Sequence, residues 1–162
     1  MTAARLELPD LEATRRLAAR LARCLRRGDL VALEGELGSG KTAFARALIR
    51  DLAGAEIEVP SPSFTLVQRY ELPGITVTHA DLYRLASPGD LLDLDLEEAL
   101  EEGALLVEWP ERAGELLPAD RLCLRFAFLP GRGEQAREVR IAAGPSWRDR
   151  LASLTADDDD AR

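Results

Sequence analysis

Apolar residues recur along the chain with two different periods, which predict which segments are helices and which are strands. After Asp10, a helix-capping residue type, leucines and alanines recur every three or four positions, which predicts an amphipathic helix. Residues 30–33 form a short apolar run typical of a buried strand, and residues 41–52 return to helical spacing, with Gly54 as the stop. A first short strand is expected at residues 5–8, so strands and helices alternate in this part of the chain.

The second half of the chain is patterned differently, with several short alternating segments. Pro60 and Pro62 exclude a helix from their segment, because proline lacks the amide donor and restricts the residue before it. Residues 64–71 and 75–81 alternate apolar and polar positions on either side of a Pro-Gly turn, which predicts a hairpin. The remaining expected elements are one or two short helices at 87–102, strands at 104–108, 121–128 and 138–142, and a closing helix at 147–154.

Alternation of strands and helices, followed by hairpins, predicts an α/β domain with a mixed parallel and antiparallel sheet flanked by helices. The 162 residues fit one domain, and no repeat or long linker divides them. We therefore expect a single domain at residues 1–154. Residues 155–162 contain a run of four aspartates and are expected to form a disordered acidic tail.

Charge and composition exclude some classes of function. The net charge of −8 argues against a broad face for phosphodiester backbones, because such affinity comes largely from neutralised phosphates. No apolar run approaches the roughly 18 residues of a membrane span, and the first residues carry no signal pattern, so we predict no membrane association. Cys24 and Cys123 lie in apolar stretches and are expected to be buried thiols of a reducing cytosol, which predicts a cytoplasmic protein.

Residues 35–42 (GELGSGKT) match the phosphate-loop pattern GxxxxGK[ST] in full, between a predicted strand and a predicted helix. Glycines allow backbone amides to approach phosphate oxygens, and the following helix presents its unpaired N-terminal amides to the anion. In this pattern the lysine, Lys41, reaches the β- and γ-phosphates and the hydroxyl of Thr42 binds Mg²⁺. The sequence therefore predicts a nucleoside triphosphate site in this loop.

Residue usage supports this site and favours ATP over GTP. Of the 21 basic residues, Lys41 alone is lysine, and it stands where a compact ammonium suits the loop better than a planar guanidinium. Guanine-specific proteins of this fold read the base with an Asn/Thr-Lys-x-Asp motif. The chain contains no asparagine and no second lysine, so ATP with Mg²⁺ is the expected ligand.

Such a site needs a carboxylate at the end of a neighbouring strand to orient Mg²⁺ or its waters. Asp81 and Glu108 each end a predicted strand, and the pattern alone does not rank them. The hydroxyls of Ser61, Ser63 and Thr65 follow the loop helix in a proline-stiffened segment. A nucleotide-sensing switch would lie there, and a plain loop is the alternative.

Four blocks of the sequence, in this order and spacing, resemble the bacterial TsaE family of small ATPases: GELGSGKT (35–42), SPSFTLVQRYE (61–71), HADLYRL (79–85) and VEWPER (107–112). The opening segment LPDLEAT (8–14) is similar too. The resemblance implies a P-loop NTPase-like three-layer fold and an ATPase required for threonylcarbamoyladenosine in tRNA. It also implies that the protein acts with the TsaD and TsaB proteins and supports their repeated turnover. ATP hydrolysis is then expected to be slow without these partners, and contact with tRNA is expected to be only indirect.

The resemblance further implies roles for individual residues. Lys41, Asp81 and Glu108 are expected to be catalytic, and the two acids are expected to join Thr42 around Mg²⁺. The expected nucleotide-binding residues are Gly38, Ser39, Gly40, Lys41 and Thr42 at the phosphates, Leu11 and Thr14 near the adenine, Trp109 beside the site, and Arg137 from the later strands.

The sequence departs from the family pattern at a few positions. Ala136 stands where a glycine is expected before Arg137, and Ser63 stands where the family usually has threonine, with the hydroxyl kept. His79, the only histidine, is expected to be structural or a neighbour of Asp81. We do not expect it to be a general base, since triphosphate hydrolysis here relies on positioning and charge stabilisation.

Two other functions stay open. A small-molecule kinase of the same fold needs an acceptor site and usually an arginine-rich lid, and Arg132 with the scattered helix arginines forms no clear lid. A non-catalytic, nucleotide-gated binding protein would bind ATP without turnover, even with its partner proteins present.

Overall fold

The computed structural model describes residues 2–156. Met1 and residues 157–162 lie outside the described part of the chain. The predicted disordered tail at residues 155–162 falls mostly on these residues, while Thr155 is helical. The elements in chain order are β1 (Thr2–Leu8), α1 (Leu11–Cys24), β2 (Leu30–Gly35), α2 (Lys41–Ala53), β3 (Val67–Leu72), β4 (Ile75–Asp81), the 3-10 helix η1 (Pro88–Leu94), α3 (Leu96–Glu102), β5 (Ala104–Glu108), η2 (Pro110–Ala113), β6 (Leu122–Phe128), β7 (Arg137–Ala143), η3 (Pro145–Arg150) and α4 (Leu151–Thr155).

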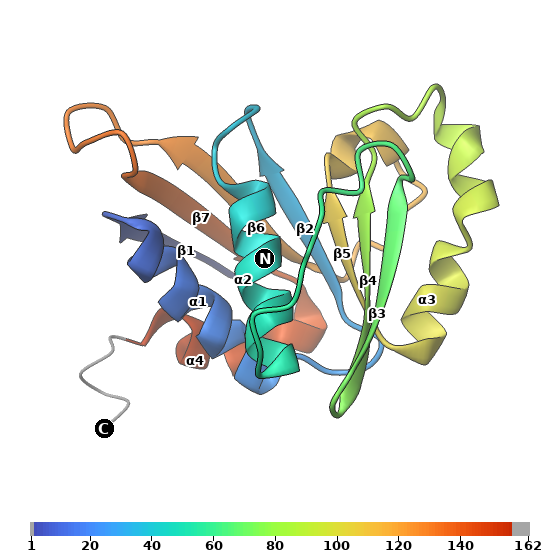
Figure 1. The fold of residues 1–162 in the computed structure, drawn as a ribbon, viewed down its shortest axis with the longest axis horizontal. Coiled ribbons are helices and arrows are strands. Elements are labelled where there is room, and N and C mark those ends of the chain that lie inside the picture. The colour runs from blue at the N-terminus through green and yellow to red at the C-terminus, as the bar shows by residue number, and fades with distance from the viewer. Residues whose placement is uncertain (1, 157–162) are drawn as a thin grey trace.

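The strands form one seven-stranded sheet in the order β1-β7-β6-β2-β5-β4-β3. The four central strands run parallel, since β2 pairs in parallel with both β5 and β6, and β4 pairs in parallel with β5. The outer strands β1, β7 and β3 are antiparallel to their neighbours. The predicted α/β class with a mixed sheet flanked by helices is confirmed, and β2 lies at the centre of the sheet (Figure 1).

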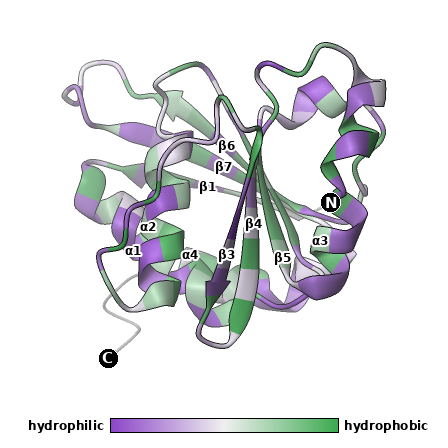
Figure 2. Ribbon diagram, turned by 45° about the vertical axis from the view of Figure 1, so that its right-hand side comes forward, coloured by the Kyte–Doolittle hydropathy of each residue, from purple (hydrophilic) through white to green (hydrophobic). Residues whose placement is uncertain are grey.

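Apolar clusters cover both faces of the central strands. Along β5 the side chains alternate, so that Leu106 joins the cluster under α1 and α2 while Leu105 and Val107 join the cluster under η1 and α3. Figure 1 shows α1 and α2 in front of the sheet and the η1–α3 segment at its right-hand side. Figure 2 shows how hydrophobic β4 is beside the more hydrophilic edge strand β3, as expected for a strand with helices on both sides.

Local sequence signals explain the elements nearest the loop. Asp10 caps α1 by accepting a hydrogen bond from the Ala13 amide at 2.9 Å, as predicted. The helix α2 ends at Gly54, whose φ of 67° is the left-handed value that glycine adopts without strain. The predicted strand at residues 64–71 begins only at Val67, because the Leu66 amide donates to Pro62 and closes a turn before it.

The two cysteines are less buried than the sequence predicts. Cys24 and Cys123 are half-buried, so the prediction that both are buried thiols was wrong in degree. Burial, assisted by the neighbouring Glu34 carboxylate, raises the pKa of Cys123 to about 12, which keeps it as an unreactive thiol at neutral pH.

Within residues 2–156, no helix has both the length and the apolar character needed to span a bilayer.

A buried ion pair ties the C-terminal helices to the start of β2. Arg150 donates to both oxygens of Asp29, at 2.6 and 3.0 Å, and to the Cys24 carbonyl at 2.9 Å. Both side chains are buried. Asp29→Ala leaves the guanidinium buried without its partner, so we expect the free energy of unfolding to fall by about 3–5 kcal/mol in urea titrations.

The matched control for this prediction is an exposed ion pair. Glu12 lies 3.5 Å from Arg15 on the surface of α1, where both side chains are mostly exposed. Glu12→Ala is therefore expected to cost less than about 1 kcal/mol. A loss below 1 kcal/mol for Asp29→Ala, equal to that of Glu12→Ala, would show that the buried pair does not hold the two segments together.

Candidate functional site

The candidate site lies at the edge of the sheet where the parallel strands β2, β4 and β5 end. The loop after β2 leads directly into α2, and this edge is at the top of Figure 1. The register aligns the strand ends, with Asp81 opposite Glu108 across β4 and β5, and Leu33 opposite Glu108 across β2 and β5. Carboxyl ends of parallel strands are the usual place for ligands in open α/β sheets.

Glycines give the loop its shape. Gly35, Gly38 and Gly40 have φ values of 142°, 79° and 116°, a region that side chains strongly disfavour. A Cβ on Gly35 would also lie 2.5 Å from both the Phe126 carbonyl oxygen and the Ser39 hydroxyl. The bare backbone therefore turns back on itself and delivers the chain into α2 with that helix's first amides facing the site.

Lys41 is held inside this loop. Its Nζ donates to the Gly35 carbonyl at 2.5 Å and lies 3.2 Å from the centroid of the Trp109 ring. Only 4% of the residue is exposed, and burial lowers the pKa of Lys41 while the charges of Glu108, Glu111 and Asp81 oppose that shift. The ammonium thus sits in a partly dry environment, where its attraction for a bound anion is stronger than in water.

Thr42, Glu108 and His79 form a chain of short contacts. The Thr42 hydroxyl donates to Glu108 Oε1 at 2.6 Å, and Glu108 Oε2 lies 2.6 Å from His79 Nε2. Glu108 and His79 are both buried. His79 was expected to be structural or a neighbour of Asp81. The structure shows it fully buried, and its imidazole reaches across to β5 and contacts Glu108, not Asp81.

Asp81 belongs to a second group of contacts. Its carboxylate accepts from the Tyr83 amide at 3.0 Å and from the Ser63 hydroxyl at 3.4 Å, and Ser63 in turn lies 2.8 Å from Ser61. Thr65 is exposed. Two of the three hydroxyls singled out in the sequence therefore reach the site.

Sequence reasoning missed two arginines that hold in place the segment carrying Ser61 and Ser63, called the hydroxyl segment below. Arg46 and Arg50, one turn apart on α2, donate through Nε to the carbonyls of Val59 at 2.7 Å and Ile57 at 3.0 Å. The available signal was the spacing of four between the two arginines on one face of the predicted helix, although this spacing does not reveal a partner that lies in a loop.

The loop and the strand ends enclose a cavity of about 260 Å³. Its lining combines the loop, the start of α2, the hydroxyl segment and both acids: Leu37, Gly38, Gly40, Lys41, Thr42, Ala43, Ser61, Ser63, Asp81, Glu108 and Trp109. Sequence-predicted residues from four separate blocks thus share one cavity. Ser39 is fully buried behind it.

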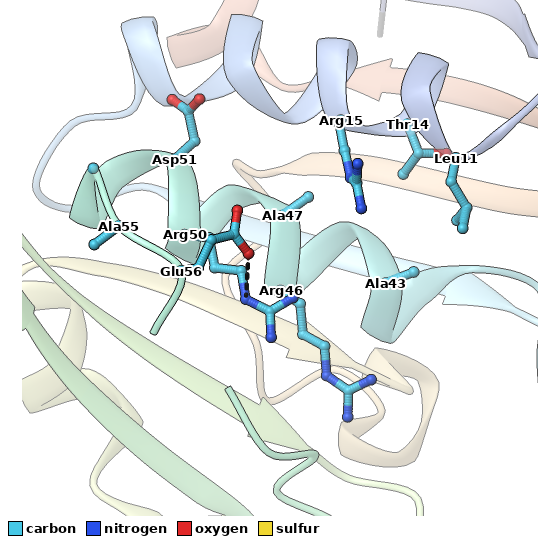
Figure 3. Close-up of a pocket in the computed structure, with 11 residues that line it drawn as sticks. Leu11, Thr14, Arg15, Ala43, Arg46, Ala47, Arg50, Asp51, Ala55 and Glu56 are labelled. Atoms are coloured by element: carbon cyan, nitrogen blue, oxygen red, sulfur yellow. Dashed lines mark ion pairs between the residues drawn. The ribbon is translucent and has the colours of Figure 1, made fainter. Parts of the chain in front are cut away.

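Leu11 and Thr14 lie in a neighbouring groove between α1 and α2, with a volume of about 540 Å³ (Figure 3). Ala43 lines both this groove and the smaller cavity, so the two depressions adjoin at the first turn of α2. Figure 3 shows Arg15, Arg46 and other polar side chains farther along the groove.

Arg137 supports the loop from β7. Its guanidinium donates to the carbonyls of Ser39 at 3.0 Å and Gly38 at 3.4 Å, and it stacks 4.6 Å from the centre of the Phe128 ring. It is not among the lining residues of the cavity. Nη1 donates instead to the carbonyls of Glu134 and Ala136, so Arg137 joins the loop to the start of β7.

The donor set suits Mg²⁺ held together with a phosphate. Thr42, Glu108 and Asp81 offer hydroxyl and carboxylate oxygens, which are the ligands that Mg²⁺ prefers. Among residues 2–156, no group of three or more His, Cys, Asp or Glu side chains forms a metal cage. Mg²⁺ usually keeps several waters and takes one or two protein oxygens plus substrate phosphates, so these residues fit it.

Fold and site define the class of the protein: an α/β domain with a seven-stranded mixed sheet, whose central strand runs through a glycine-rich GxxxxGKT loop into a helix. Residues 8–138 match the family model described as "Threonylcarbamoyl adenosine biosynthesis protein TsaE". The chain belongs to the TsaE family.

Individual relatives agree with this assignment. The protein named tRNA threonylcarbamoyladenosine biosynthesis protein TsaE from Rickettsia felis is 43% identical over 112 residues, which are 69% of this chain and 66% of that protein. Its namesake from Streptomyces coelicolor is 39% identical over 147 residues, 88% of this chain and 99% of that protein. The crystal structure of YdiB from Bacillus subtilis has a TM-score of 0.78 at 28% identity and covers 95% of both chains. This chain spans 66% and 61% of the lengths of the Rickettsia felis and Rickettsia conorii relatives.

Proposed function

We propose that this protein is a P-loop ATPase that binds Mg–ATP and serves the formation of threonylcarbamoyladenosine in tRNA. One observation carries the proposal: Lys41 and Thr42 open α2 inside a glycine loop, and the Thr42 hydroxyl contacts the buried Glu108 at 2.6 Å. Membership of the TsaE family supports the link to tRNA modification.

The phosphates of ATP would bind along the loop. Amides of the loop and of the first turn of α2 would donate to the phosphate oxygens, and the start of α2 would add the positive end of its dipole. The Lys41 ammonium would exchange the Gly35 carbonyl for β- and γ-phosphate oxygens. The nucleoside would lie in the adjoining groove, where Leu11 and Thr14 meet Ala43.

The two acids would take different parts in hydrolysis. Glu108 accepts a hydrogen bond from the Thr42 hydroxyl, so the lone pairs of that hydroxyl stay free for Mg²⁺. Mg²⁺, when bound, would supply charge that neutralises the developing negative charge on the β- and γ-phosphate oxygens. Asp81, next to Ser63, would orient the attacking water, and the hydroxyl segment would sense the γ-phosphate.

The partners of the reaction would be the TsaD and TsaB proteins, whose repeated turnover the ATPase supports. Direct binding of tRNA is not part of the proposal, because a chain of net charge −8 lacks the cationic excess that phosphodiester backbones require. The proposed location is the cytoplasm.

Assays of ATP hydrolysis, alone and with TsaD and TsaB, test the function. We expect slow release of inorganic phosphate by the protein alone and faster release with both partners present. ATP labelled at the γ-phosphate separates the alternatives: label transferred to an acceptor would identify a kinase. ATP binding without phosphate release, even with the partners, would identify a nucleotide-gated binding protein.

A further inference from the structure

The His79–Glu108 contact has no part in the functions derived above. His79 is fully buried in β4, and its Nε2 lies 2.6 Å from Glu108 Oε2. The other oxygen of Glu108 accepts from Thr42 at 2.6 Å. The carboxylate is therefore held from two sides, by the histidine on one oxygen and by the loop threonine on the other.

The surrounding contacts assign the direction of this hydrogen bond. Glu108 already accepts from the Thr42 hydroxyl through Oε1, so we assign the proton between Oε2 and the imidazole to His79 Nε2. His79 Nδ1 is buried and has no hydrogen-bond partner in the described part of the chain. A neutral ring protonated on Nδ1 instead would leave a buried donor unpaired and set two acceptors against each other at 2.6 Å, which is the more costly arrangement.

We propose that His79 is a positioning residue for the Mg²⁺ site. Its Nε2–H holds one oxygen of Glu108, which turns the other oxygen onto Thr42 and directs the lone pairs of the threonine hydroxyl into the cavity. The inference rests on the proposed function, because it assigns Thr42 and Glu108 to Mg–ATP. His79 itself does not line the cavity, so it acts only through Glu108.

Two substitutions separate this role from simple packing. His79→Gln keeps an amide N–H at about the reach of Nε2, whereas His79→Leu keeps apolar bulk and removes the donor. For His79→Leu we expect the gain in ATP affinity on adding Mg²⁺ to fall about tenfold and kcat with TsaD and TsaB to fall about 10–100-fold, the usual cost of losing a partner of a metal ligand. ATP affinity without Mg²⁺ should stay unchanged, and His79→Gln should recover most of both losses.

A second readout does not depend on activity or on a variant that folds. His79 is the only histidine, so ¹⁵N NMR of the untagged wild-type protein reports a single imidazole. We expect a proton on Nε2. An unprotonated Nε2 would overturn the proposal, as would a His79→Leu protein with wild-type Mg²⁺ dependence and kcat. Equal losses in both variants that follow their melting temperatures would also overturn it, because they indicate packing alone.

Calorimetry of ATP binding tests the proposed function, and ¹⁵N NMR of His79 tests the role of this residue separately. Failure of the wild-type protein to bind ATP, measured by calorimetry, would remove the proposed function. The NMR result would still decide whether His79 donates to Glu108. Normal ATP binding together with an unprotonated Nε2 would leave the function standing and remove the role of His79.

Discussion

Lys41→Ala is expected to weaken ATP binding by about 10²–10⁴-fold, measured by calorimetry in the presence of Mg²⁺. The ammonium is the only lysine in the chain and is buried within the loop, so no other side chain takes its place. Two charge-assisted contacts to phosphate oxygens at about 1.5–3 kcal/mol each give about 3–6 kcal/mol, and each 1.4 kcal/mol is about tenfold in affinity.

Two controls accompany this variant. Arg148→Ala removes one positive charge from an exposed position on η3, away from the loop, and should leave ATP affinity unchanged. Lys41→Arg keeps the charge but places a longer, planar group under Trp109, and should also bind poorly. Wild-type affinity in Lys41→Ala would contradict the assignment of the phosphates to this loop.

Glu108→Gln is expected to lower kcat with TsaD and TsaB by about 10²-fold or more, while the protein still folds and binds ATP. The amide keeps the size of the side chain but removes the charge that faces Thr42, and loss of one such electrostatic group typically costs about 10²–10³ in kcat. Glutamine is preferable to alanine here, because Glu108 is buried between His79 and Thr42 and truncation would leave a cavity.

The matched control is Glu111→Gln. Glu111 is exposed on η2, and its charge also acts on Lys41, so this variant makes the same change of charge nearby without touching Thr42. It should keep kcat within about twofold, since surface charges are screened. Equal turnover by Glu108→Gln and the wild-type protein would remove Glu108 from the reaction.

Elements with strong local signals could be predicted from the sequence. The cap at Asp10 and the stop at Gly54 depend on neighbours a few residues away, and both are confirmed. The placement of Lys41 and Thr42 at the start of α2 follows from the loop pattern, because the pattern itself requires strand, glycine turn and helix. Asp81 and Glu108 could be named as candidates because each ends a strand that the apolar pattern predicts.

Features that depend on distant parts of the chain could not be predicted. The partner of His79 is set by the pairing of β4 with β5, and the position of Arg137 is set by β7 lying beside β6 and bringing it to the loop. The turn at Leu66, with φ of 67°, shortened a strand that the alternation alone extends. Arg46 meets the Val59 carbonyl only after the segment folds back along α2. In each case tertiary packing decides between local options of similar free energy.

A crystal structure with a non-hydrolysable ATP analogue and Mg²⁺ tests the central claim most directly. The account predicts β- and γ-phosphates within the turn of residues 35–42, with Lys41 Nζ moved from the Gly35 carbonyl onto phosphate oxygens and Thr42 at the metal. An empty turn at saturating analogue, with Lys41 still bonded to Gly35, would contradict it.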